Sequence, residues 1–204
     1  MKLPITLLFA FAIYSSCTKE YLRSSIVLVP DEFHSYFFFD SGSYWIYQDT
    51  VTNDFDTLTC DFSVDDTTTD LENNMFYENA YSHFINKGWW NLGNNISNSC
   101  RTYQSNKDSL YVSVLSGFDL RSPIVVGNIC DQILCTNCIV ISHVDSILNS
   151  YSVNSFSLGK TIVVSVQNDN NQTGQNSQYY FSGGVGLIRY IRNGDYKLVS
   201  YHLE

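Results

Sequence analysis

The chain has 204 residues, with 11 Lys and Arg against 20 Asp and Glu, which gives it a formal net charge of −9. This acidic balance makes nucleic acid a poor partner and argues against adhesion to anionic lipid through a basic patch. The length suits one domain of ordinary size, large enough to bury a sizeable core without depending on disulfides.

The first sixteen residues have the pattern of a lipoprotein signal peptide. Lys2 gives a minimal positive start, and the apolar run from Leu3 to Ile13 is too short to span a bilayer. Small residues at positions 15 and 16 precede Cys17, where cleavage and lipidation, palmitate included, are expected. Ordinary secretion with cleavage elsewhere stays open, because Tyr14 stands where the usual signal has an aliphatic residue.

Cleavage before Cys17 defines the expected organisation of the chain. A signal peptide (1–16) precedes a lipidated tether (17–29), in which residues 26–29 could add a strand, and a single antiparallel β domain (30–204) follows. The lipid on Cys17 would hold the exported protein in the outer membrane of a Gram-negative bacterium. Both the periplasmic and the surface face of that membrane remain open.

From residue 30 onward, short segments rich in aromatic and β-branched residues alternate with Asn, Asp, Ser and Gly clusters about every ten residues. This spacing is typical of an antiparallel all-β domain. Ile162, Val164 and Val166 should share one face of a half-buried strand. We expect about ten strands and no long helix, in a sandwich or a curved, partly closed barrel.

The carboxyl-terminal segments 186–192 and 195–203 flank Asn193-Gly194. Asn-Gly is the strongest two-residue hairpin signal, because both central positions of a type I′ turn need positive φ. The sequence therefore predicts a terminal β-hairpin at this point.

Two aromatic-glycine segments frame the expected domain. The first is Gly42-x-x-Trp45-x-Tyr47, and the second is the run YFSGGVGLIR at 180–189, followed by LVSY at 198–201. Together they resemble segments of Bacteroidetes cell-envelope lipoproteins of the flavobacterial type. The resemblance implies an envelope location and a β fold, and it supplies no activity and no catalytic residues.

The physical interpretation of these segments is structural. Trp45 and Tyr47 should bring large apolar area to the core. Gly183, Gly184 and Gly186 should permit a bulge or a tight bend between paired strands. A glycine-rich phosphate loop is disfavoured, because no Lys-Ser or Lys-Thr and no helix start follow the glycines.

Trp89 and Trp90 form the second aromatic feature, between Gly88 and Gly93. Two indole rings exposed side by side could stack on a sugar ring, so the pair is a candidate ligand-binding site. More often one ring of such a pair lies in the core.

Five cysteines remain after Cys17 is assigned to the lipid, so they cannot all pair within one chain. Up to two disulfides are expected, most plausibly in the 130–138 cluster. Alternatively, Cys130, Cys135, Cys138 and His143 offer three thiolates and an imidazole that could enclose Zn²⁺. No cofactor is otherwise expected.

No linear motif of an enzyme is present. The chain lacks a Gly-x-Ser-x-Gly elbow, and His143 with Asp145 is better interpreted as a surface contact. We therefore expect a lipid-anchored, non-catalytic envelope domain that binds a protein, a glycan or a small apolar ligand. The alternative is a glycan-directed envelope hydrolase whose two carboxylates lie far apart in sequence.

Overall fold

The computed structural model describes residues 26–70, 75–86, 95–102, 110–115, 118–121, 123–135, 138–168 and 176–204. The signal peptide, Cys17, Trp89 and Trp90 lie outside the described residues, so the expectations for them stay predictions. Within these ranges, no helix has the length and apolar character needed to cross a membrane.

The described part of the chain is built almost entirely from strands. They are β1 (Ile26–Val27), β2 (Tyr44–Asp49), β3 (Phe55–Asp70), β4 (Met75–Asn86), β5 (Asn95–Thr102), β6 (Leu110–Val114), β7 (Phe118–Arg121), β8 (Ile129–Cys135), β9 (Cys138–Leu148), β10 (Tyr151–Val153), β11 (Phe156–Leu158), β12 (Thr161–Asn168), β13 (Asn176–Ser182), β14 (Gly186–Ile191) and β15 (Asp195–His202). The expected all-β class is confirmed.

Thirteen strands form one sheet in the order β7-β6-β5-β4-β3-β2-β15-β14-β13-β12-β9-β8, with β1 added in parallel to β4. Every other pair is antiparallel, and β10 with β11 forms a separate hairpin. The sheet has more strands than the ten or so expected. Strands as short as β1 and β7 hold too few residues for a visible alternation of polar and apolar positions.

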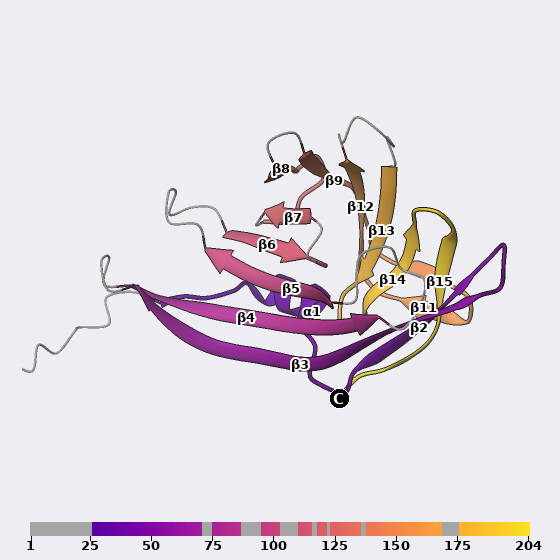
Figure 1. Cartoon of the computed structure of the whole chain (residues 1–204), viewed down its shortest axis with the longest axis horizontal. Helices are drawn as coiled ribbons and strands as arrows, with labels where there is room; N and C mark the ends of the chain where they lie inside the picture. Colours follow the sequence, from indigo (N-terminus) through magenta and orange to yellow (C-terminus); the bar gives the residue numbers. More distant parts are fainter. Residues whose placement is uncertain are drawn as a thin grey trace, which may run out of the picture.

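The sheet is strongly curved. Figure 1 shows β3 to β6 as one broad layer and β12 and β13 standing steeply to it. The two ends of the sheet approach each other, since the Ser142 hydroxyl in β9 donates a hydrogen bond to the Asp119 carbonyl in β7. The ladders between the described strands do not join β7 to β8, so the sheet is partly closed and does not form a complete barrel.

Aromatic rings fill the core inside this curve. Trp45 and Tyr47, which are 1% and 0% exposed, project inward from β2 as predicted. The Trp45 indole donates a hydrogen bond to the Val185 carbonyl (2.6 Å), and the Tyr47 hydroxyl donates to the Leu187 carbonyl (2.9 Å). These bonds satisfy the polar atoms of both rings, so the core keeps their apolar area without leaving a buried donor unpaired.

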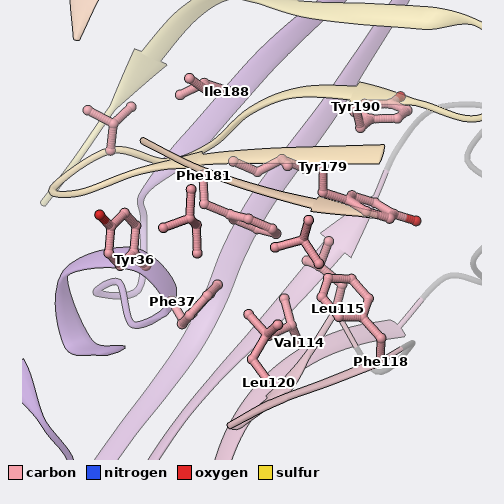
Figure 2. Packing of buried hydrophobic residues seen from close by; sticks show 14 of the residues in the cluster. Tyr36, Phe37, Val114, Leu115, Phe118, Leu120, Tyr179, Phe181, Ile188 and Tyr190 are labelled. Atoms are coloured by element: carbon pink, nitrogen blue, oxygen red, sulfur yellow. The ribbon is translucent and has the colours of Figure 1, made fainter. Parts of the chain in front are cut away.

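A short helix, α1 (Asp31–Phe37), packs against the inner side of the sheet and was not predicted. Its buried residues Phe33, Tyr36 and Phe37 have the spacing of one helical face. Figure 2 shows Phe37 directed toward Phe181 of β13, and the two ring centroids are 5.1 Å apart. The helix therefore adds one aromatic face to the core that the sheet encloses.

The terminal hairpin is confirmed, but its turn differs from the predicted type. Ile191 pairs with Asp195, and neither Asn193 nor Gly194 has positive φ, so the turn is not type I′. The glycine serves close packing instead, because a Cβ at position 194 would lie 2.2 Å from Asp49 Oδ2.

The predicted glycine bend is present between β13 and β14. Gly184 and Gly186 have φ of 73° and 86°, a region that favours glycine. A Cβ on Gly186 would also lie 2.8 Å from the Phe39 ring. The bend thus places β14 against the segment that follows α1.

The alternation predicted for β12 is present with one irregularity. Ile162, Val164 and Val166 are all buried, but Val163 is buried as well. The register shift beside Val163 and Val164 places its extra residue, Asp145, in β9, so the alternation along β12 itself is not interrupted.

Candidate functional site

A cavity of about 260 Å³ lies on the inner face of β3 and β4. Helix α1 and the segment that follows it form its other wall. The chain's last two residues, Leu203 and Glu204, form another of its sides. The cavity is therefore lined by parts of the chain that are far apart in sequence.

Strand pairing determines which side chains line the floor of the cavity. Asp65 in β3 lies opposite Ala80 in β4, and Ser63 lies opposite Ser82. Directly opposite residues share one face of an antiparallel sheet. Ala80 and Ser82 are 1% and 0% exposed, so this is the inner face. The core side of the sheet thus becomes polar at this end of β3 and β4.

The roof of the cavity is held in place by the backbone after α1. The Phe39 N–H donates to Ser82 Oγ (3.1 Å), and the Ser82 hydroxyl donates to the Phe39 carbonyl (3.3 Å). The Phe39 ring packs edge-on against Trp45, with the centroids 4.9 Å apart. Because these contacts fix the roof to the core, the cavity is a preformed feature of the fold.

His34, Asp65 and Glu78 converge beside the cavity from α1, β3 and β4. One ligand atom from each residue lies within 4.8 Å of the other two. His34 Nε2 is 3.0 Å from Glu78 Oε1, while Glu78 Oε2 accepts a hydrogen bond from the Val29 N–H (2.7 Å). Asp65 is exposed and lines the cavity together with His34.

The charge of the cavity is strongly negative. Its lining includes the acidic residues Asp40, Asp65 and Glu204, of which Glu204 also lies 3.1 Å from His202 Nε2, and no Lys or Arg from the described residues lines it. Several carboxylates around one concave surface raise the local concentration of cations. The cavity therefore suits a positively charged ligand or a metal ion.

A second polar cluster lies on the opposite, outer face of the sheet. His143 Nδ1 is 2.8 Å from Asp145 Oδ1, and the other Asp145 oxygen accepts hydrogen bonds from the Ser165 hydroxyl and from Gln178 Nε2 (3.1 Å). Partial burial alone would raise the pKa of Asp145, but these hydrogen bonds outweigh it and hold the pKa below its usual range.

The outer cluster does not have the arrangement of a catalytic triad. In a triad the serine hydroxyl is hydrogen-bonded to the histidine, and here Ser165 donates to Asp145 instead. The carboxylate is thus the centre of the cluster, with its oxygens taken up by neighbouring strands. His143 and Asp145 thus form a partly exposed surface contact, which is how the sequence was interpreted.

The outer cluster continues across β13 and β14. The Tyr180 hydroxyl donates to Gln178 Oε1 (2.7 Å), and the Arg189 guanidinium lies 5.1 Å from the Tyr180 ring centroid. Arg189 also donates to both oxygens of Asp195, at 2.7 and 2.8 Å. Each charged group in this row has a defined partner.

The predicted cysteine cluster lies in the hairpin of β8 and β9. Cys135 pairs with Cys138 next to the turn, whereas Cys130 pairs with Ser142. Cys130 and Cys135 are five positions apart along an extended strand, a separation of about 16 Å. Cys130 and Ser142 are buried while His143 is half-exposed, so Cys130 and His143 lie on opposite faces of the hairpin. The disulfide and zinc alternatives for Cys135 and Cys138 stay predictions.

Cys60 and Cys130 are the cysteines whose side chains the structure describes, and no disulfide joins them to each other. The Cys60 thiol donates to the Phe39 carbonyl (3.3 Å). Burial, with the nearby charges of Asp61 and Asp40, raises the pKa of this thiol to about 12. Cys60 is therefore held as an inert thiol under the cavity roof.

Sequence reasoning missed His34, Asp65 and Glu78. The one available signal was the helical spacing of Phe33, Tyr36 and Phe37 directly after Pro30, which would have identified α1. Nothing in the linear sequence shows that this helix lies over β3 and β4.

Neither a protein-family model nor a curated protein sequence matches this chain. Two solved structures are similar to it. The first is a presumed exported protein with a YmcC-like fold from Bacteroides fragilis, 8% identical, with a TM-score of 0.44 over 82% of this chain and 99% of that one. The second is a presumed lipoprotein from Parabacteroides distasonis, 10% identical, with a TM-score of 0.41 over the same shares. These descriptions are those of the two similar proteins.

Proposed function

We propose that the chain is an exported, lipid-anchored, non-catalytic domain of the cell envelope that binds a small ligand in the cavity beside α1. The ligand would combine an apolar ring with a positive charge. The observation that carries this proposal is the pairing of an aromatic roof, formed by Phe38 and Phe39, with a carboxylate-rich lining that holds no Lys or Arg among the described residues.

The size of the cavity limits the ligand. A volume of about 260 Å³ is slightly below the range of roughly 300 to 1,000 Å³ that drug-sized ligands occupy. The aromatic rings can pack on an apolar body, and a cation near a ring face gains additional attraction. A small aromatic amine has both features.

A matched pair of probes tests the proposal. Isothermal titration calorimetry on the full chain would compare 2-phenylethylamine with 2-phenylethanol, which has the same ring and no charge. We expect the amine to bind and the alcohol to bind at least tenfold more weakly, because only the ammonium interacts with the carboxylates.

A pair of neighbouring carboxylates supplies the control. Asp65 lines the cavity, while Asp66 accepts a hydrogen bond from Asn79 (3.1 Å) and does not line it. Asp65→Asn should weaken amine binding about three- to tenfold, and Asp66→Asn should leave it unchanged. Equal binding of the two probes, or an equal effect of the two variants, would contradict the proposal.

The lipid anchor is part of the same proposal and has its own test. Cys17→Ser should prevent labelling of the protein with palmitate and release it from membranes. Retention of the unlabelled variant on membranes would exclude a lipid on Cys17 as the anchor.

A glycan hydrolase is the second candidate, because Asp65 and Glu78 have carboxylate oxygens within 4.8 Å of each other. Retaining glycosidases hold their two carboxyl groups about 5 to 5.5 Å apart. Turnover of any glycan in a panel, abolished by Glu78→Gln and not by Asp66→Asn, would favour this candidate over the binding domain.

A further inference from the structure

We infer that His34, Asp65 and Glu78 form a binding site for a divalent transition-metal ion at the edge of the cavity. This site goes beyond the proposed small-ligand function, since it rests on the geometry of three side chains and not on the cavity's roof. It also differs from the cysteine site considered from the sequence, with which it shares no residue.

The distances match those around a metal ion. Two neighbouring ligands at right angles, each about 2.1 Å from an ion, lie about 3.0 Å apart. His34 Nε2 and Glu78 Oε1 are 3.0 Å apart. The three ligand atoms lie within 4.8 Å of one another, while opposite ligands of such an ion are about 4.2 Å apart. A small movement of Asp65, which is exposed, would complete the set.

Two of the three ligands are positioned by neighbouring groups. The Val29 N–H holds Glu78 Oε2 at 2.7 Å, which leaves Oε1 directed at His34. The Phe38 ring packs against the His34 imidazole, with the centroids 5.1 Å apart. Groups that orient the ligands in this way are a regular part of protein metal sites. Asp65 provides the open side through which an ion can enter.

The ligand set selects the class of metal. Mg²⁺ and Ca²⁺ prefer all-oxygen sites, whereas an imidazole nitrogen suits Zn²⁺ and other late first-row transition-metal ions, and the two carboxylates also suit Mn²⁺. The two carboxylates together balance the charge of a divalent ion. Asp40 and Glu204 in the cavity lining add attraction at longer range.

Other histidines in the described residues show what distinguishes this group. His83 with Asp61, and His143 with Asp145, each pair with one carboxylate. Within the described ranges, the His34 group is the one place where three metal-ligating side chains converge this closely. The His83–Asp61 and His143–Asp145 pairs therefore serve as internal controls for the His34 group.

The test uses Mn²⁺ and the full chain after treatment with EDTA. Free Mn²⁺ gives a six-line electron paramagnetic resonance signal that is lost on binding, and Mn²⁺ has little affinity for the chain's thiols. We expect one Mn²⁺ per chain, displaced by Zn²⁺ and not by an equal concentration of Ca²⁺. His34→Gln and Asp65→Asn should each weaken binding at least tenfold.

His83→Gln and Asp66→Asn are the matched controls and should bind Mn²⁺ like the parent chain. Asp65 is exposed, so its variant stays folded and keeps the test valid even if a change at His34 disturbs α1. Absence of binding, equal loss in controls and site variants, or equal displacement by Ca²⁺ would overturn the inference. Mn²⁺ binding without 2-phenylethylamine binding would uphold the metal site and reject the proposed small-ligand function.

Discussion

Two clusters in this molecule each join a histidine to a carboxylate, and they differ in what surrounds the carboxylate. On the outer face, the oxygens of Asp145 are shared among His143, Ser165 and Gln178. On the inner face, Glu78 meets one backbone N–H and His34, and a second carboxylate lies beside them.

The difference separates a structural cluster from a candidate binding site. Neutral donors from two adjacent strands satisfy Asp145, so it fixes the pairing of β9, β12 and β13 without need of a ligand. At the inner cluster, Asp65 places a second negative charge near Glu78, an arrangement that an added cation would stabilise. Removing Asp145 should therefore cost stability, whereas removing Asp65 should cost binding.

The largest expected effect is that of Asp145→Ala. The change leaves Ser165, His143 and Gln178 without their shared acceptor, and hydrogen bonds to a charged group contribute about 1.5 to 3 kcal/mol each. We expect the free energy of unfolding in urea to fall by about 3 kcal/mol. A loss below about 0.5 kcal/mol would show that the outer cluster is not structural.

Glu78→Ala should have an intermediate effect. It removes the acceptor of the Val29 N–H and the partner of His34, which together tie α1 and the residue before Pro30 to β4. Leaving a partly buried donor unpaired costs about 1 to 3 kcal/mol, so we expect a loss of about 1.5 kcal/mol by urea unfolding. Glu78→Gln keeps an acceptor for Val29 and should recover part of it; no recovery would contradict this explanation.

The pH dependence of stability should also distinguish the two clusters, with a smaller effect than the two alanine variants. The folded-state pKa of Asp145 lies below its unfolded value of about 3.9, so its contribution is present above that pH and is lost as the pH falls through the folded pKa. Asp145→Asn should therefore flatten the decline of stability below about pH 4. A decline as steep as that of the parent chain would contradict the role assigned to this carboxylate.

Asp65→Ala should have the smallest effect on stability. The side chain is exposed, so we expect a change of at most about 0.5 kcal/mol in the free energy of unfolding. Urea titrations of the parent chain and the variant, without metal, measure it. A loss comparable to that of Asp145→Ala would remove the distinction between the two clusters.

The sequence predicted the local features of the fold well. The terminal hairpin, the burial of Trp45 and Tyr47 and the glycine bend all follow from patterns within a few residues. The turn type at Asn193-Gly194 was wrong, because contact with Asp49 and not backbone conformation requires the glycine. Tertiary packing decided that position, and the sequence does not display it.

The candidate site could not be predicted, because its residues come together only through long-range packing. The register of β3 and β4 places Asp65 opposite Ala80, two positions from Glu78. His34 joins them from α1, whose seven residues are too few for a strong helical period. The aromatic and cysteine features that stood out in the sequence belong to the core or to other strands, or lie outside the described residues.

One measurement tests the central claim most directly: the change in Tm that Mn²⁺ causes in the parent chain, Asp65→Asn and Asp145→Asn. A ligand at 100 times its Kd stabilises the folded state by about 2.7 kcal/mol. We predict that Mn²⁺ raises the Tm of the parent chain and of Asp145→Asn by the same amount, although Asp145→Asn starts from a lower Tm. Asp65→Asn should start at the parent value and rise by at most about half as much, because a tenfold weaker Kd leaves at most about 1.4 kcal/mol of stabilisation at the same concentration. An equal rise in Asp65→Asn, or no rise in the parent chain, would contradict the account.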